Sequence, residues 1–555
     1  MSHPRCSLAI AIALLLDASP SRAQWTVDGV LVSSASGTNV SPVVVPDGTG
    51  GSLIGWQYSG PSPKQVLLSH LTSDGQLAPG FPAAGIPVAA DGSSPSFRSA
   101  RSDGDQGIVL GWLVGADCAV TRLHGDGALA TGWSPGGNTF TFPNGANNAA
   151  FVDFCPDGAG GGWILVRYDY SFCPDICYNS SSASAKHISA SGVGDGSVGI
   201  ASSPYYGGTG GSLFPAAGGV SFAYGYGGDG FDAWIDRVDG SGSLWHLHLD
   251  VQHIAALNAV DDGAGGGLLL TLGGYGLMPP RLLHVLATGA FDPTWPLNGV
   301  PVISETASPS YVPAVAGDAG SILFAWTTSG PNGVQVRMQK ITAAGLVAAG
   351  WPDTGRVVCD APGARDDLSL ASDGAGGAFA AWRDGRDVAN GDVYAHHVWH
   401  DGRLDPAFAT HGTGVVTLHA GVGTLHLAPV ATGAAVLAWS DLRSAGDSQI
   451  RAALVQIAGP LAVDPRPKSR LALAGFTPNP SPSGQPRIAF NLAEPGDVTL
   501  ELFDVLGRRV HQQQVDGAAA GWHSLAVSSA LPAGLYEIRL RTGADVRSAR
   551  GLILR

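Results

Sequence analysis

The stretch SDGAGGAFAAW, residues 372–382, recurs along this chain and decides its fold. An Asp-Gly pair with further glycines is followed by an apolar run that ends in tryptophan. Glycine accepts positive φ and aspartate bonds nearby backbone amides, so the polar half predicts a hairpin turn and the apolar half a strand. The other seven copies are PDGTGGSLIGW at 46, SDGDQGIVLGW at 102, PDGAGGGWILV at 156, AAGGVSFAYGY at 216, DDGAGGGLLLTL at 261, GDAGSILFAW at 317 and ATGAAVLAW at 431.

The spacing of these copies predicts a β-propeller. Asp47 and Gly433 are 386 residues and seven intervals apart, a period of about 55. A second phrase, such as DGRLDPAFATHGTGVV at 401–416, supplies a turn and a fourth strand for each copy. Four antiparallel strands in a repeat of about 40 to 60 residues are typical of a propeller blade. We expect eight blades, and seven stay open because the pattern is blurred over residues 190–260.

The two ends of the repeat region predict how the ring closes. QWTVDGVLVSS at the start of the mature chain matches the fourth-strand phrase, but no other strands of a blade precede it. The last copy has no fourth strand before the Pro-rich segment that follows. We therefore expect residues 25–33 to complete the last blade, which would pair two strand edges that are otherwise open.

Composition and the N-terminal segment indicate an exported all-β protein. The 80 Gly and 37 Pro of the 555 residues favour short strands and turns over helices. Residues 1–23 are predicted to be a signal peptide, because Arg5 precedes an apolar run and Ser21-Arg22-Ala23 fits a cleavage site. No later segment is long and apolar enough to span a membrane. The net charge of −14 without a Lys/Arg cluster makes nucleic acid an unexpected partner.

Two neighbouring repeats share a charged addition, WRDGRD at 382–387 and WSDLRS at 439–444. One interpretation is structural: each carboxylate accepts hydrogen bonds from its own arginine and from turn amides. Replacing Asp384 and Arg386 by Ala would then lower the stability by about 1 kcal/mol or less. The other interpretation is a ligand-binding site at which both arginines meet an anion. The candidate residues are Trp382, Asp384, Arg386, Trp439, Asp441 and Arg443.

Histidines and cysteines suggest neither a metal nor a cofactor. His396, His397 and His400 alternate across a predicted strand, so that His396 and His400 share one face. Without a third ligand, all three are better explained as histidines on the strand surface. Five cysteines remain after the signal peptide. An odd number leaves at least one unpaired. We expect one disulfide among Cys118, Cys173 and Cys177, which lie in equivalent predicted loops.

A different kind of domain follows the repeats. Residues 24–460 are assigned to the propeller, 461–472 to a linker, and 473–555 to a small β-sandwich of alternating strands. Its phrases NPSPSGQPRIAFNLAEPGDVTLELFDVLGRRV, AAAGWHSLAVSSALPAGLYEIRLRTG and RSARGLILR resemble the C-terminal sorting domain of type IX secretion substrates and the immunoglobulin-like domain of the hook-capping family. The motif positions are Asn479, Pro480, Asp504, Gly507, Arg508, Gly521, Gly534 and Tyr536.

This resemblance implies passage across the outer membrane of a Gram-negative-type bacterium, with the domain as an address that is read by the secretion machinery. We therefore expect a secreted or cell-surface propeller that serves as a binding, adhesion or scaffold module for an extracellular glycan or protein. The alternative is a carbohydrate-active enzyme, a glycosidase or polysaccharide lyase built on the ring. That function requires converging acids or a nucleophile with its base. The acidic residues fall mostly in turns, which favours binding.

Overall fold

The computed structural model separates the chain into two compact units, Met1–Ile457 and Ala458–Arg555. It describes residue 25 and residues 28–60, 63–89, 94–115, 117–140, 148–157, 159–172, 178–203, 208–216, 219–226, 232–239, 242–249, 254–273, 280–296, 298–303, 312–386, 391–417, 421–444, 446–457, 472–476, 481, 485–492, 496–518, 521–528, 530–543 and 545–554. The proposed signal peptide lies outside these ranges, as does the proposed linker except for Ala472, which begins β33. Within them, no helix is long and apolar enough to cross a membrane.

The described part of the first unit forms eight four-stranded antiparallel sheets, numbered here as blades 1 to 8. Blades 1 to 4 are β2 (Thr38–Pro46), β3 (Ser52–Ser59), β4 (Gln65–Leu71), β5 (Ile86–Ala89); β6 (Ser96–Ser102), β7 (Ile108–Val114), β8 (Asp117–Leu123), β9 (Asn138–Phe140); β10 (Asn148–Pro156), β11 (Gly162–Phe172), β12 (Tyr178–Ile188), β13 (Gly194–Ser203); β14 (Gly208–Ala216), β15 (Gly219–Tyr226), β16 (Asp232–Asp239) and β17 (Gly242–Leu249).

Blades 5 to 8 continue in the same order, with one 3-10 turn, η2 (Asp318–Gly320), in blade 6. They are β18 (Ile254–Asp261), β19 (Gly267–Gly273), β20 (Arg281–Val285), β21 (Val300–Pro301); β22 (Ala314–Ala316), β23 (Ile322–Gly330), β24 (Gly333–Ile341), β25 (Arg356–Cys359); β26 (Arg365–Ser372), β27 (Ala378–Asp384), β28 (Asp392–Val398), β29 (Thr413–Val416); and β30 (Val422–Ala431), β31 (Ala434–Ser444), β32 (Asp447–Gln456) with β1 (Val30–Leu31).

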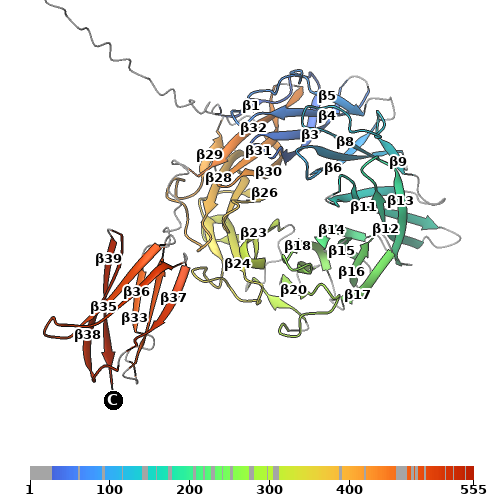
Figure 1. The fold of residues 1–555 in the computed structure, drawn as a ribbon. Helices are drawn as coiled ribbons and strands as arrows, with labels where there is room; N and C mark the ends of the chain where they lie inside the picture. The colour runs from blue at the N-terminus through green and yellow to red at the C-terminus, as the bar shows by residue number, and fades with distance from the viewer. Residues whose placement is uncertain are drawn as a thin grey trace, which may run out of the picture. The chain divides into compact units, whose positions relative to one another are not determined.

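The eight sheets stand around a common axis as a closed ring (Figure 1). The first strands of neighbouring blades contact one another, as β2 does β30 and β14 does β18, so the first strands lie nearest the axis. Side chains of one first strand bond to the backbone of the next: Asp367 Oδ2 and Ser369 Oγ of β26 accept from the amides of Leu425 and Leu427 in β30. The β-propeller with eight blades is therefore confirmed.

The aspartate of the repeated phrase organises the turn between the first and second strands. In blade 7, Asp373 Oδ1 accepts hydrogen bonds from the amides of Ala375 and Gly377, at 2.6 and 2.9 Å. Asp47 does the same for Thr49 and Gly51 in blade 1. The structural function predicted for the phrase is thus confirmed.

The second oxygen of this aspartate binds a basic side chain on the third strand of the same blade, which the sequence pattern did not predict. His397 Nε2 lies 3.0 Å from Asp373 Oδ2, and its Nδ1 lies 3.1 Å from Asp405. The other pairs of this kind are His70 with Asp47, Arg122 with Asp103, His187 with Asp157 and His284 with Asp262. In blade 6, Gly317 takes the place of the aspartate, and Lys340 binds the next residue of the turn, Asp318. A contact between an acidic and a basic side chain therefore ties the first turn to the third strand in six blades of the described part of the ring.

The tryptophan that ends the phrase packs against a glycine before the fourth strand. Trp382 of β27 is fully buried, and a Cβ added to Gly412 would lie 2.7 Å from its ring. Gly412 has φ +89°, so a side chain there is disfavoured by space and by backbone conformation. The same contact joins Trp56 with Gly85, Trp112 with Gly137, Trp326 with Gly355 and Trp439 with Gly29.

The Trp439–Gly29 contact shows how the ring closes. β1 pairs with β32 through Val30 and Ala452, and Arg451 Nη1 donates to the Gly29 carbonyl at 3.0 Å. The N-terminal segment therefore completes blade 8, as the sequence predicts, but the paired strand is shorter than residues 25–33. Asn39 reinforces the closure, because its amide and its side chain both bond to Ser448.

The second unit consists of two antiparallel sheets packed face to face. One contains β33 (Ala472–Phe476), β34 (Arg487–Leu492) and β37 (Gly521–Ala526), and the other contains β36 (Arg509–Ala518), β35 (Gly496–Phe503), β38 (Gly534–Thr542) and β39 (Asp545–Ile553). Buried side chains of both sheets, such as Phe490 and Ile538, form a single core. This sandwich agrees with the predicted fold class.

We predict that Gly29→Val opens the ring. Gly29 has φ +78° and its added Cβ would lie 2.2 Å from Trp439, so the substitution adds a clash to the backbone strain of about 1–3 kcal/mol. Gly80→Val is the matched control, because Gly80 has φ +92° and no atom within 4 Å of an added Cβ. In urea unfolding, the free energy of unfolding should fall further for Gly29→Val than for Gly80→Val. Gly29→Val should also aggregate through the exposed edge of β32. Equal losses for the two variants would contradict this account of closure.

Candidate functional site

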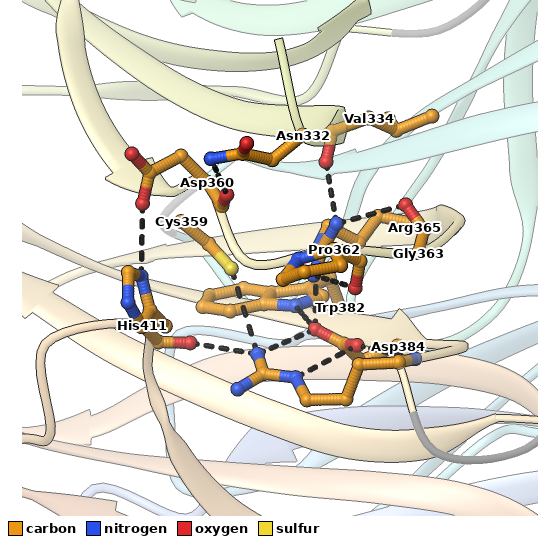
Figure 2. Close-up of polar contacts among 11 residues, drawn as sticks. Asn332, Val334, Cys359, Asp360, Pro362, Gly363, Arg365, Trp382, Asp384 and His411 are labelled. Atoms are coloured by element: carbon orange, nitrogen blue, oxygen red, sulfur yellow. Dashed lines mark hydrogen bonds and ion pairs between the residues drawn. The ribbon is translucent and has the colours of Figure 1, made fainter. Parts of the chain in front are cut away.

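The charged cluster of blade 7 surrounds a buried carboxylate. Asp384, at the end of β27, has no solvent exposure. Its Oδ2 accepts from the Trp382 indole Nε1 at 2.8 Å and from Arg386 Nη2 at 2.6 Å. Its Oδ1 accepts from the amide and from Nε of Arg386, both at 2.9 Å. Figure 2 shows these contacts. The structure thus brings Trp382, Asp384 and Arg386 together.

A second arginine, which the sequence did not single out, binds the same carboxylate from inside the protein. Arg365 begins β26, is 4% exposed, and donates from Nε to Asp384 Oδ2 at 3.1 Å. Its other nitrogens donate to the carbonyls of Val334, Gly363 and Pro362. Because Val334 belongs to blade 6, Arg365 fixes two neighbouring blades to each other (Figure 2).

The guanidinium of Arg386 also contacts a backbone carbonyl, a thiol and an aromatic ring. Its Nη2 donates to the His411 carbonyl at 2.8 Å and lies 3.5 Å from Cys359 Sγ. Its guanidinium also lies 3.8 Å from the centre of the Tyr394 ring, a cation–π contact. Burial alone would raise the pKa of Asp384, but the hydrogen bonds from Arg386 and Trp382 keep this pKa below its usual value. The carboxylate is therefore a permanent anion that two arginines neutralise.

Blade 8 repeats the arrangement with one change. Asp441 accepts from Trp439 Nε1 at 3.0 Å and from Arg443 Nε at 2.6 Å, and burial and hydrogen bonds again oppose each other with a net lowering of its pKa. Val422 pairs with Asp441 in the register at which Arg365 pairs with Asp384, so this blade lacks the inner arginine. Arg443 donates to the Asp28 carbonyl of the closing segment at 3.4 Å, as Arg386 does to the carbonyl of His411.

These contacts favour the structural interpretation of the six candidate residues. The two arginines do not converge, since each binds the aspartate of its own blade. The contacts lead us to expect a larger energetic effect than about 1 kcal/mol, because Asp384 faces a buried Arg365 and is not part of an exposed pair. Binding of a ligand by Trp382, Asp384, Arg386, Trp439, Asp441 or Arg443 stays a prediction.

The structure places two histidines and one cysteine differently from the sequence prediction. His396 and His397 are buried, not on the strand surface, because His397 bridges two aspartates and His396 stacks on Phe408. Cys118 is a free, fully buried thiol on β8 rather than in a loop, and burial raises its pKa. Cys173 and Cys177 lie outside the described residues, so the disulfide stays a prediction. No metal-holding group of His, Cys, Asp or Glu occurs in the described part of the chain.

An open groove lies between blades 1 and 2, at residues that the sequence reasoning missed. Its volume is about 460 Å³, and it is formed by the first turns and the third-strand ends of both blades. Hydrogen bonds from His70 and Thr49 outweigh the effect of burial and lower the pKa of Asp47 to about 2, so this wall keeps its negative charge. The lining residues are Asp47, Thr49, His70, Ala78, Pro79, Asp105, Gln106, His124, Gly125 and Asp126.

In the second unit, the motif residues hold one hairpin and one strand. Asp504 accepts from the amides of Leu506 and Arg508, and Gly507 has φ +76°. Tyr536 is buried on β38, and its hydroxyl donates to the Pro532 carbonyl at 2.8 Å. Gly521 and Gly534 begin β37 and β38. Asn479 and Pro480 lie outside the described residues.

Comparison with protein families identifies the second unit. Residues 476–554 match the secretion system C-terminal sorting domain. This sorting domain belongs to the type IX system, as its motifs indicated, and it marks the protein for secretion or attachment to the cell surface. The match covers the C-terminal part of the chain alone, and a search of the curated proteins gave no match.

Solved structures resemble the chain only distantly. Prolyl oligopeptidase B from Galerina marginata is 12% identical, with 74% of this chain and 56% of that chain covered and a TM-score of 0.39. A protein of unknown function from Dyadobacter fermentans is 10% identical, with 78% and 99% covered and a TM-score of 0.36. The β-propeller domain of the Trilobed protease from Pyrococcus furiosus is 9% identical, with 69% and 98% covered and a TM-score of 0.33. This chain spans little more than half of the oligopeptidase, and these scores support no inference about activity.

We predict that Asp384→Ala lowers the free energy of unfolding of the ring by about 3–5 kcal/mol, because it leaves the buried Arg365 without a counter-charge. The double replacement of Asp384 and Arg386 should be as costly, since Arg365 remains. Asp401→Ala, which breaks an exposed pair with Arg403, should change the stability by about 0.5 kcal/mol or less. Unfolding in guanidinium chloride measures the free energy of unfolding of each variant. A loss of ligand affinity at unchanged stability would instead establish a binding site at Asp384.

Proposed function

We propose that this chain is a propeller exported to the cell exterior, where the ring binds an extracellular glycan or protein and the sorting domain is its address. The observation that carries this proposal is the match of residues 476–554 to the sorting domain. The domain forms a compact unit with its own core, apart from the ring. The ring is then the transported part, and its function is exerted outside the cell.

The distribution of charge supports two separate functions. Residues 25–457 contain 17 Lys and Arg against 35 Asp and Glu, a formal net charge of −18. Residues 458–555 contain 11 against 8, a net charge of +3. A strongly negative ring stays soluble and repels other acidic surfaces. Its partners are therefore uncharged or cationic, as neutral glycans and basic protein segments are.

The groove between blades 1 and 2 has the chemistry for such a ligand. The exposed Asp105 and the imidazole of His124 line it from blade 2, and the Thr49 hydroxyl with the apolar Ala78 and Pro79 lines it from blade 1. Carboxylates, an imidazole and a hydroxyl can bond to the hydroxyl groups of a sugar, while an apolar wall packs against its C–H face. We assign the binding of a neutral glycan to this groove.

The cell fraction in which the protein accumulates tests the sorting function of residues 458–555. In a host with type IX machinery, a chain ending at Ile457 should accumulate in the periplasm, because it lacks the sorting domain, while the full chain reaches the surface or the medium. Fusing residues 458–555 to an inert exported reporter should carry that reporter out. Immunoblots of the cell fractions measure both results. A reporter that stays in the periplasm while the truncated propeller reaches the surface would disprove the assignment.

A glycan array with the full-length protein tests the ligand. The double variant Asp105→Ala/His124→Ala should weaken binding to any retained glycan at least tenfold, a loss of about 1.4 kcal/mol. Asp401→Ala/Arg403→Ala removes an exposed charge pair in blade 7 and is the matched control. Equal binding by both variants would exclude the groove. Release of reducing sugar from a bound polysaccharide would favour the carbohydrate-active enzyme.

A further inference from the structure

The hairpin that joins β35 to β36 in the sorting domain has an unusual tip. In Asp504-Val505-Leu506-Gly507, the Gly507 amide donates to the Asp504 carbonyl and the Asp504 amide donates to the Arg508 carbonyl, both at 2.9 Å. The side chain of Asp504 also accepts from the amide and Nε of Arg508. This turn is therefore fixed by its own hydrogen bonds, yet its two tip residues are large and aliphatic.

Val505 and Leu506 are the two most exposed large apolar side chains in the described part of the chain, at 75% and 74%. They are neighbours in sequence at the end of a rigid hairpin. Burying both would remove two large apolar side chains from water, and a folded domain gains nothing from presenting them to solvent. A partner that covers them is the simplest reason for their position.

The described part of the propeller contains the same turn six times, which provides an internal comparison. Each has the same two backbone hydrogen bonds and a glycine at φ +74° to +82° in the fourth position, against +76° at Gly507. The tip pairs there are small or polar: Ser73-Asp74, Gly125-Asp126, Ala190-Ser191, Ala287-Thr288, Ala343-Ala344 and His400-Asp401. The turn geometry therefore does not require Val505 and Leu506.

The propeller turns also show what such a turn binds. Trp351 of blade 6 lies against Gly402 of blade 7, 3.1 Å from an added Cβ, and its indole Nε1 donates to the His400 carbonyl at 3.0 Å. The glycine is thus the floor of a docking surface for an aromatic ring. The same stacking pairs Trp25 with Gly75, Phe81 with Gly127, Trp133 with Gly192 and Trp295 with Gly345. At Gly507, no described residue lies within 4 Å of an added Cβ.

We propose that the tip Val505-Leu506 with the open face of Gly507 is the surface by which the sorting domain docks on the type IX export machinery. The partner is a protein recess that carries an aromatic side chain, which stacks on Gly507 while apolar walls cover Val505 and Leu506. This inference rests on the proposed sorting function of the domain, and it names the surface that the export machinery recognises. The propeller turns are poor competitors for this recess, because all six tips are polar or small and aromatic rings already cover the glycines at 75, 127, 192, 345 and 402.

Export of the full chain in a host with type IX machinery tests the inference. The variant Val505→Ser/Leu506→Asp gives the hairpin the tip of the Thr72–Gly75 turn, so the same turn chemistry is kept. We expect at least a tenfold fall in the surface and medium fractions, with folded, protease-resistant protein in the periplasm. Val505→Ile/Leu506→Met keeps an apolar tip and should be exported like the wild type. Val193→Ser/Leu346→Ser removes two exposed aliphatic side chains of the propeller and should also have no effect.

The outcomes separate this inference from the proposal beneath it. Normal export of Val505→Ser/Leu506→Asp, or failure of the conservative variant, overturns the docking surface and leaves the address function intact. Normal export of a chain ending at Ile457 overturns the address function itself. Purified full-length protein provides a further check: tip-dependent dimers in sedimentation, or tip-dependent binding to phosphatidylethanolamine–phosphatidylglycerol vesicles, would mean that a second copy or a lipid surface occupies the tip, and would refute the machinery as the partner.

Discussion

The ring depends on an aromatic side chain of one blade lying flat on the glycine turn of the next. A turn with positive φ at its fourth residue leaves that face without a Cβ, so a ring can approach the backbone and donate to a carbonyl of the same turn. Trp133, Trp295 and Trp351 all do this, each bonding to a carbonyl of the following blade. Among the described residues, an aromatic ring meets the glycine in this way between blades 8 and 1, 1 and 2, 2 and 3, 5 and 6, and 6 and 7. A propeller whose blades share few backbone hydrogen bonds needs such side-chain joints.

Buried charge serves the same purpose within and between blades. Asp373 and its equivalents use one oxygen to hold the turn and the other to hold the third strand through a His or Arg. Asp384 goes further, because Arg365 extends its network to the Val334 carbonyl of blade 6. A buried ion pair of this kind contributes modest net stability when it is intact, but breaking it is costly. Its effect is to specify one arrangement of the blades, and this explains why charges in a chain with only 13% charged residues gather in turns.

The two units divide the work of the chain. In the ring, the charged and polar side chains of the repeated turns mostly bond to other groups of the ring. An open groove remains between blades 1 and 2. The sorting domain keeps a small, separately packed core and exposes a hairpin tip. The same turn is thus used in two ways: covered by a neighbouring blade in the ring, and open in the sorting domain, where its exposed residues are available to another protein.

The sequence alone determined the class of fold, because period is a local property: a glycine turn and an alternating strand repeated about every 55 residues leave few architectures other than a propeller. It also determined the ring closure and the identity of the sorting domain, since both rest on repeated or familiar phrases. The tertiary structure decided which side chains contact one another. Arg365 lies 19 residues from Asp384 and repeats in no other blade, so no pattern joined them. His397 reads as a surface residue in an alternating strand, but two aspartates from separate turns enclose it. The groove likewise arises from turns of two blades, and a contact between segments far apart in the chain leaves no periodic trace in the sequence.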